Sequence, residues 1–383
     1  MTAAETTFSK RDLSIDILRG IVMLLMALDH SRFFFSDFKY DPTNLQYAGT
    51  ALFLTRWITN FCAPVFVLLS GTSAFLSLTK TGSKKQASLK LLTRGIWLII
   101  LEITFVRLGW TFDFNNNHIY LQVIWAIGCS MIALSALLFL PLQFILAIGL
   151  IMIFGHNLLD GIHAPDNSVL NILWRLLHVS GPVTYGNGNT LVILYPLIPW
   201  IGIMALGYCM GPLFMKDNKQ QQNTLLLIGI VSVILFIAVR SINLYGDPQP
   251  WQTQHIWRRS ILSFINCTKY PPSLLFILST LGPAFILLPF LKRIKRRFAN
   301  MLLVYGKVPM FFYLLHIYLI HGMAVIAGHF IHSNNTAGLT SHTGFSLPVV
   351  YAFWLAAIVI LYFPCRWFMK IKATSKKWWL SYL

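Results

Sequence analysis

Five ionisable residues lie in the first apolar segment of the chain, where charge is costly. Residues 14–34 read SIDILRGIVMLLMALDHSRFF and contain Asp16, Arg19, Asp29 and His30, followed by Arg32. Ionisable groups at membrane depth are expensive, so they usually face a protein interior or a water-filled cavity and mark functional positions. This segment therefore predicts a functional site on the first helix.

The spacing of these residues places most of them on one side of a helix. At about 100° per residue, Asp16, Arg19, Met23, Met26 and His30 share one stripe. Arg19 and His30 are then about 16 Å apart along the helix axis. The stripe predicts a channel lined by a cation near one membrane edge and by an imidazole further out.

Two kinds of chemistry fit this stripe. The guanidinium of Arg19 suits a phosphate-bearing donor such as coenzyme A, and the imidazole of His30 suits general-base work on a hydroxyl or an amine. Asp29 or another carboxylate could orient the imidazole. A structural interpretation also fits, in which Asp16 and Arg19 form an i,i+3 ion pair and Asp29 with His30 caps the outer helix end.

Further candidate residues lie in other segments. Arg56 and Asn60 are one turn apart and could line an outer mouth, or the asparagine could simply cap a helix. Tyr313 and His316 share a helical face, which suits a proton relay or a hydrogen-bonded core histidine. Trp251 lies in an outer segment whose aromatic and polar residues suit either a sugar or an interfacial belt.

Other ionisable and metal-binding residue types give weaker signals. Glu102 and Arg107 lie inside the third apolar run and are expected to pair with another helix. His316 and His321 lack the i,i+4 spacing of a helical metal site, so no metal is predicted there. The five cysteines contain no CxxC pair, which argues against a disulfide framework or a zinc site.

Long apolar runs must position these residues. Of the 383 residues, 56% are hydrophobic and only 11% are charged, which is too little charge to cover a soluble core. Runs of roughly 20 apolar residues should be helices, because lipid cannot satisfy an open backbone. We predict an all-α integral membrane protein, one polytopic domain over 1–383, with about ten transmembrane helices. They are expected at 14–34, 61–79, 95–112, 120–139, 142–159, 191–214, 224–243, 272–291, 302–328 and 346–368.

Basic residues are distributed unevenly between these runs. With the N-terminus inside, 20 of the 30 lysines and arginines fall on the inner side and 8 on the outer side. The positive-inside rule therefore places both termini in the cytoplasm, with a short tail over 1–13. The net charge of +18 follows from this bias, so the expected partner is the lipid bilayer and not nucleic acid. The long segments are expected outside: 35–60, 160–190, 244–271 and 329–345.

A series of motifs resembles one family. Asp16-x-x-Arg19-Gly20, followed by His30, is similar to the first helix of transmembrane acyltransferases. RWITNFCAPVFVLLSG (56–71), YPLIPWIGIMALGYCMG (195–211) and YGKVPMFFYLLHIYLIH (305–321) extend the likeness, in order, over nearly the whole chain. The chain most closely resembles bacterial proteins that share the catalytic domain of heparan-alpha-glucosaminide N-acetyltransferase.

The resemblance implies acyl transfer in a bacterial inner membrane. Acetyl-CoA would be the donor from the cytoplasm, and the amine or hydroxyl of an extracytoplasmic sugar or glycan would be the acceptor. No bound cofactor is implied, and a homodimer is left open. The lysosomal member has its catalytic histidine in the first lumenal loop, but residues 35–60 contain none here. Asn60 stands where the bacterial relatives have histidine, whereas His30 matches the histidine of the polysaccharide O-acyltransferases.

We therefore predict a membrane acyltransferase in which His30 deprotonates the acceptor or positions the thioester, and Asp29 orients His30. Direct attack by the acceptor and an acyl-histidine intermediate are both open. A transporter of a small molecule or lipid-linked sugar is the alternative, because buried charge fits that function too. The residues expected to bind donor or acceptor are Asp16, Arg19, Arg32, Arg56, Asn60, Trp251, Tyr313 and His316.

Overall fold

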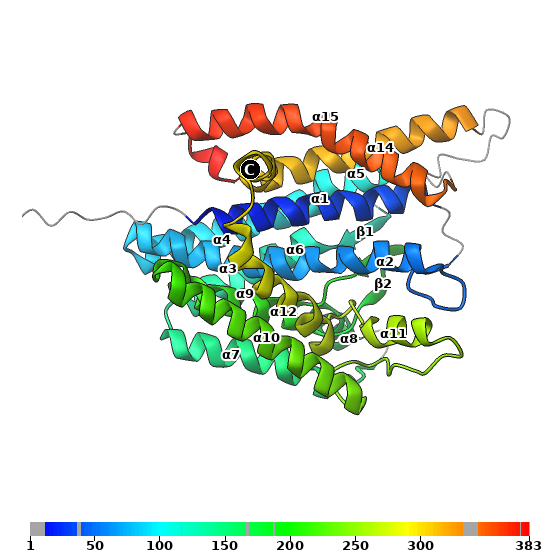
Figure 1. Ribbon diagram of the computed structural model, residues 1–383, viewed down its shortest axis with the longest axis horizontal. Coiled ribbons are helices and arrows are strands. Elements are labelled where there is room, and N and C mark those ends of the chain that lie inside the picture. Colours follow the sequence, from blue (N-terminus) through cyan, green and yellow to red (C-terminus); the bar gives the residue numbers. More distant parts are fainter. Residues whose placement is uncertain are drawn as a thin grey trace, which may run out of the picture.

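Long helices lying side by side make up most of the molecule, with α1 (Leu13–Phe35) among them (Figure 1). The computed structural model describes residues 12–36, 40–115, 117–165, 168–186, 188–331, 344–375 and 377–382. Residues 1–11 of the predicted tail, Lys39, Lys376 and most of the predicted outer segment 329–345 lie outside this part of the chain. α1 contacts α3, α12, α13, α14 and α15, so the helix that carries the polar stripe is the centre of the bundle.

Seven helices of the described part have the length and composition needed to cross a membrane, so the chain is a multi-pass membrane protein. All seven coincide with predicted spans. α3 (Cys62–Thr81) continues from the shorter α2 (Thr50–Ile58) and η1 (Thr59–Phe61). The seven are Thr50–Thr81, Leu142–Leu159, Leu197–Met215, Asn218–Ile242, Leu274–Leu291, Pro309–Phe330 and Leu347–Thr374.

The other three predicted spans are helices with a less typical composition. α1 has 23 residues but carries Asp16, Arg19, Asp29 and Arg32. α6 (Val123–Leu137) is apolar but only 15 residues long. α4 (Lys84–Leu101) begins well before the predicted boundary at 95, because Ser83 caps it by accepting a hydrogen bond from the backbone N–H of Gln86. The total number of spans and the side of each terminus stay predictions.

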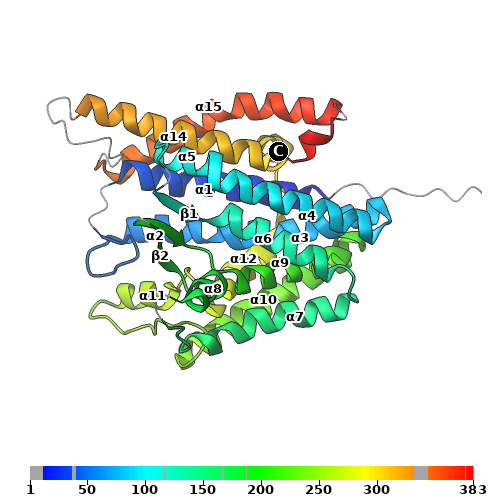
Figure 2. The same ribbon diagram turned by 180° about the vertical axis from the view of Figure 1, so that it is seen from behind.

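The remaining helices complete the bundle and its connections. α4 runs through a π-helical turn, η2 (Glu102–Val106), into α5 (Arg107–Thr111), and it packs beside α6 (Figure 2). The others are α7 (Leu142–Gly155), η3 (His156–Leu159), α8 (Val169–Leu177), α9 (Leu197–Met210), η4 (Gly211–Met215), α10 (Asn218–Ile242), α11 (Trp257–Ile265), α12 (Leu274–Leu291), α13 (Arg296–Gly306), α14 (Pro309–Ile331), α15 (Leu347–Thr374) and η5 (Trp378–Ser381).

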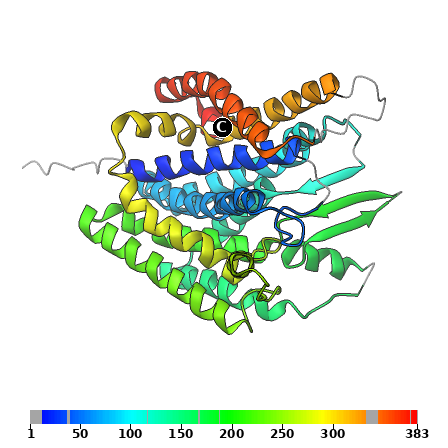
Figure 3. The same cartoon turned by 45° about the vertical axis from the view of Figure 1, so that its right-hand side comes forward.

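A small sheet corrects the all-helical prediction. β3 (Asn189–Ile193) lies between β1 (His118–Leu121), which is parallel to it, and β2 (Gly181–Tyr185), which is antiparallel. The strands extend beyond the ends of the neighbouring helices (Figure 3). Two of them fall in segment 160–190 and its border, which the sequence pattern left as a loop. Short strands in which apolar and polar residues do not clearly alternate give little signal in the sequence. The polar composition of this region therefore predicted a loop.

Glycine permits a close approach between α1 and α13. A Cβ added to Gly20 would overlap the carbonyl of Leu302, and one added to Gly306 would overlap the carbonyl of Asp16. The two backbones therefore touch directly. This contact explains the glycine that follows Arg19, and it holds the polar stripe against the C-terminal helices.

Replacing Gly20 by alanine is expected to destabilise the protein. The added methyl group must push two backbones apart, and such overpacking costs about 1–3 kcal/mol of unfolding free energy. The melting temperature of the detergent-solubilised protein measures it. Gly322→Ala is the matched control, because a Cβ at that position in α14 meets no atom within 4 Å. Equal melting of the two variants would contradict the close approach.

Candidate active site

Two histidines from opposite ends of the chain form a hydrogen-bonded pair at the centre of the site. His30 on α1 and His316 on α14 approach with 2.7 Å between His30 Nδ1 and His316 Nε2. Their rings are nearly parallel, 16° apart, with centroids separated by 4.8 Å. His316 is fully buried at 0% exposure, and its Nδ1 lies 3.1 Å from the carbonyl oxygen of Phe312. The pair joins two parts of the chain 286 residues apart.

The backbone carbonyl sets the direction of hydrogen bonding in this pair. A carbonyl oxygen can only accept, so in the neutral pair His316 Nδ1 carries the hydrogen and its Nε2 has the lone pair. His30 Nδ1 must then donate to His316 Nε2, which leaves the lone pair of His30 on Nε2. Among the described residues, no hydrogen bond is formed by His30 Nε2. His30 therefore presents a basic nitrogen, and His316 holds it in that tautomer.

Aromatic rings enclose the pair. Trp110 of α5 meets His30 edge to face, with centroids 4.7 Å apart, and Tyr313 lies 6.5 Å from His30. Phe312 stacks on His316 with 5.2 Å between centroids. These rings limit the access of water to the pair. The predicted face shared by Tyr313 and His316 thus points at His30.

Asp29 makes hydrogen bonds other than the predicted one to His30. Its Oδ1 accepts a hydrogen bond from Arg32 at 3.0 Å, and its Oδ2 accepts one from Arg56 at 3.2 Å. Its hydrogen bonds within the described residues go to these guanidiniums and not to His30. The imidazole is therefore oriented by His316. Asp29 pairs with Arg32 within α1 and joins α1 to α2 through its ion pair with Arg56. A neighbouring carboxylate in sequence points elsewhere because adjacent helical residues do not face each other.

We call Asp29, Arg32, Arg56, Asn60, Tyr195, Lys269 and Tyr270 the outer cluster. Arg56 also donates to Asn60 at 3.4 Å, so these two predicted residues do meet one turn apart. The hydroxyls of Tyr195 and Tyr270 lie 3.5 Å apart. Burial opposes ionisation of Tyr270, but the charges of Lys269 and Arg56 outweigh it and lower the pKa of this phenol. The cluster is a charged, hydrogen-bonding region next to His30.

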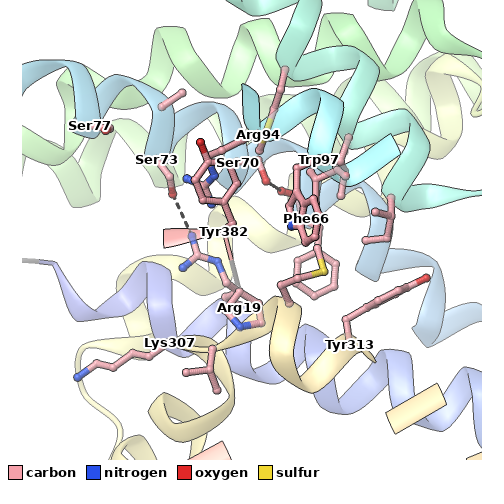
Figure 4. A pocket seen from close by; sticks show the side chains of 18 of the residues that line it. Arg19, Phe66, Ser70, Ser73, Ser77, Arg94, Trp97, Lys307, Tyr313 and Tyr382 are labelled. Carbon is pink, nitrogen blue, oxygen red and sulfur yellow. Dashed lines mark hydrogen bonds between the residues drawn. The ribbon is translucent and has the colours of Figure 1, made fainter. Parts of the chain in front are cut away.

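A cavity of about 580 Å³ lies on the other side of the pair, at the basic end of the bundle (Figure 4). Phe66, Trp97 and five methionines provide apolar walls, and serines of α3 provide hydroxyls. No carboxylate of the described residues lines it. Its cationic side chains are Arg19, Lys90, Arg94, Lys307, Lys370 and Lys372.

The predicted stripe on α1 lines this cavity. Arg19, Met23 and Met26 all face it. Arg19 donates to Asp16 at 2.9 Å and to Ser73 at 3.0 Å, so the ion pair and the cavity-lining position, predicted as alternatives, occur together. The cavity reaches Met26 and Tyr313, which precede His30 and His316 by one helical turn. The cavity therefore ends about one helical turn before the histidine pair.

Several residues lie elsewhere than predicted. The indole of Trp251 donates to the carbonyl of Arg240 at 2.9 Å, which makes it part of the loop that follows α10 and not of the cavity. Glu102 and Arg107 do not pair with each other or with a charged partner on another helix among the described residues. Glu102 accepts from the backbone N–H of Trp125 at 3.0 Å, and Arg107 donates to the carbonyl of His118 at 3.1 Å. Each thus satisfies backbone groups at element ends.

Sequence reasoning missed most of the cations that line the cavity. Lys90 and Arg94 precede the predicted span at 95–112, and in the structure they lie one turn apart on α4 and share a face. Their i,i+4 spacing just before an apolar run was the available signal. Lys370 and Lys372 near the end of α15 carried no spacing signal, because only the fold brings them to the cavity.

The candidate site has three parts: a cationic cavity, a histidine pair with an available basic nitrogen, and the polar outer cluster. The family model of the heparan-alpha-glucosaminide N-acetyltransferase catalytic domain matches residues 11–250, which include Arg19, His30, Arg56 and the helices α1 to α10. His316 and Tyr313 lie beyond the matched range. No curated protein matches the chain closely enough to compare. Because the model covers more than half of the residues, the chain belongs to the heparan-alpha-glucosaminide N-acetyltransferase catalytic family.

Proposed function

We propose that this protein transfers an acetyl group from cytoplasmic acetyl-CoA to the amine or hydroxyl of a sugar or glycan on the opposite side of the bacterial inner membrane. Family membership supports membrane acetyl transfer, and the histidine pair at the end of the cationic cavity supports this division of donor and acceptor sides. The observation that carries the proposal is that pair, with one basic nitrogen left available.

The donor would lie in the cavity with its phosphates on the cations. Six basic side chains line the cavity and no carboxylate of the described residues does, although Arg19 is paired with Asp16 beside it. This lining favours a polyanion, and guanidinium and ammonium groups both bind phosphate well. The pantetheine arm would follow the apolar wall of Met23, Met26 and Phe66. Its thioester would then reach Tyr313, one turn from the histidine pair. The length of the cavity thus separates the charged end of the donor from the reacting carbonyl.

The reaction would take place at His30 Nε2. In direct transfer, the acceptor nitrogen or oxygen attacks the thioester carbonyl while His30 Nε2 takes its proton. The carbon–sulfur bond then breaks, and the proton passes to the departing thiolate. In the covalent alternative, His30 Nε2 attacks the carbonyl, and the carbon–sulfur bond breaks to release the thiolate. The acceptor then attacks the acyl-imidazolium, the bond from the carbonyl carbon to Nε2 breaks, and the acceptor's proton passes through the freed Nε2 to the thiolate. Both routes require the tautomer that His316 sets, and the outer cluster would hold the acceptor.

Release of coenzyme A by the purified, detergent-solubilised protein tests the proposal. We expect release from acetyl-CoA to depend on an added amino sugar and to accompany acetylation of that sugar. A transporter needs two compartments and would release nothing in detergent. No acceptor-dependent release across a panel of amino sugars and neutral sugars, from protein that binds acetyl-CoA, would refute acetyl transfer. Labelled acetyl-CoA without acceptor, followed by acid quenching, distinguishes the two routes by the presence of acetylated protein.

A further inference from the structure

A second polar cluster lies at the outer end of α7, away from the histidine pair. His156 is the first residue of η3, Asp160 follows η3, and His178 follows α8. One ligand atom from each of the three residues lies within 4.8 Å of the other two. His156 and His178 are both buried, at 1% exposure each. Nothing in the mechanism proposed above uses these residues.

The imidazoles of this cluster are not satisfied by the protein. Neither ring nitrogen of His156 has a hydrogen-bond partner among the described residues, and the same is true of His178 Nδ1. Only His178 Nε2 is bonded, at 3.1 Å from Asp160 Oδ1. Buried polar groups without partners are costly and therefore rare in folded proteins. The two buried imidazoles leave three ring nitrogens without a hydrogen-bond partner among the described residues. This indicates that an electron-pair acceptor is missing from the cluster.

We propose that His156, Asp160 and His178 bind a zinc ion. Two imidazoles and one carboxylate are a donor set that zinc favours, whereas calcium and magnesium favour oxygen ligands alone. Tetrahedral zinc at about 2.1 Å from its ligands needs ligand atoms about 3.4 Å apart, so small side-chain movements close the site. Water completes the fourth position.

The surroundings of Asp160 are already arranged for this role. Asn157 Nδ2 donates to Asp160 Oδ2 at 2.8 Å, which leaves Oδ1 directed at the imidazoles. The other end of the Asn157 side chain accepts from the backbone N–H of Leu274 at 2.9 Å. Hydrogen bonds of this kind orient metal ligands and raise their affinity. Asn157 therefore joins the zinc site to the start of α12.

The zinc site also supports the outer cluster. Two residues after His178, the hydroxyl of Ser180 donates to the carbonyl of Tyr270 at 2.9 Å. Leu274, bound by Asn157, lies four residues after Tyr270 on the other side. Both ends of the segment that carries Tyr270 are thus attached to the proposed site. Zinc would fix the segments 156–180 and 270–274 to each other, independently of any acetyl transfer.

Zinc binding by the purified full-length protein tests this proposal. After removal of metal with dipicolinate, we expect titration with zinc alone to give one bound ion per chain and to raise the melting temperature. His156→Ala and Asp160→Asn are expected to weaken binding by at least about tenfold. His163→Ala is the matched control, because this exposed histidine of the same segment lies outside the cluster and should leave binding unchanged.

X-ray absorption of the zinc-loaded wild type keeps the test independent of how the variants fold. We expect a first shell of nitrogen and oxygen at about 2.0–2.1 Å, with the multiple scattering of two imidazoles and no sulfur. A wild type that takes up no zinc, or zinc whose binding is equal in wild type and Asp160→Asn, would overturn the site. A shell without imidazole scattering would do so too.

Discussion

Replacing His30 by glutamine is expected to lower the rate of acetyl transfer by roughly 10²–10⁴-fold, the usual contribution of a general base. Glutamine keeps the size and polarity of the side chain but has no basic nitrogen. Binding of acetyl-CoA should stay near that of the wild type, because the cavity ends one turn before His30. Steady-state coenzyme A release and a separate binding titration measure the two effects.

A matched control for this substitution is His321→Gln. His321 lies on the same helix as His316, is buried, and bonds through Nδ1 to the carbonyl of Gly109 at 2.9 Å without touching His30's nitrogens. Its replacement should change the rate by no more than a few-fold in protein that elutes normally on gel filtration. Equal losses in both variants would mean that the helix packing, and not the base, was disturbed.

Substitutions of His316 offer a finer test of the same pair. Their effect on the rate of acetyl transfer should depend on whether the new side chain can accept the hydrogen bond from His30 Nδ1. His316→Phe removes the atom that receives the hydrogen of His30 Nδ1, whereas the amide oxygen of His316→Gln can replace it. We therefore expect glutamine to retain more activity than phenylalanine. Residues that only orient a catalytic group typically contribute about 10–100-fold when removed. The reverse order would contradict the tautomer derived from Phe312.

The second large effect is expected in the donor cavity. The double substitution Lys90→Gln with Arg94→Gln should raise the KM for acetyl-CoA by about tenfold or more, with kcat little changed. A tenfold change corresponds to ~1.4 kcal/mol, less than the ~1.5–3 kcal/mol of one well-formed hydrogen bond to a charged group. The two side chains are expected to contact phosphate on the donor and not the reacting carbonyl.

S-acetylpantetheine, which lacks the phosphates of acetyl-CoA, makes this prediction specific. The KM for S-acetylpantetheine should be the same for the wild type and the double variant. The preference for acetyl-CoA over S-acetylpantetheine should therefore be smaller in the double variant than in the wild type. Lys295→Gln removes a basic residue of the same end of the bundle that does not line the cavity, and should leave both donors unchanged. If the double variant weakened both donors equally, the cations would support the fold and not the donor.

Periodicity and apolar length in the sequence were enough to predict the long apolar helices and one wall of the cavity. The stripe of Arg19, Met23 and Met26 follows from the helical repeat alone, and these residues line the cavity as expected. The predicted spans also follow from apolar length. Periodicity cannot predict which helix packs against each face of a given helix. The bond between His30 and His316 joins residues 286 positions apart, so only packing of α1 against α14 reveals it.

The same limitation explains the role of Asp29 and the proposed zinc site. Asp29 is adjacent to His30 in sequence, but two arginines on different helices determine where its oxygens point. His156, Asp160 and His178 have no recognisable motif spacing, since the third ligand follows a separate helix. A search by spacing along one helix therefore could not detect them. The composition of the polar segments between the apolar runs predicted loops, but it did not predict which of their side chains contact each other.

The carbonyl of Phe312 has a consequence for the energetics of the membrane. The hydrogen-bond chain from His30 through His316 ends on this carbonyl oxygen, which can neither give up nor carry away a proton at neutral pH. A proton taken by His30 Nε2 must therefore leave from the same nitrogen, and in direct transfer it goes to the departing thiolate. The pair is a closed end and not a proton wire, so it gives the proton gradient no path through His316.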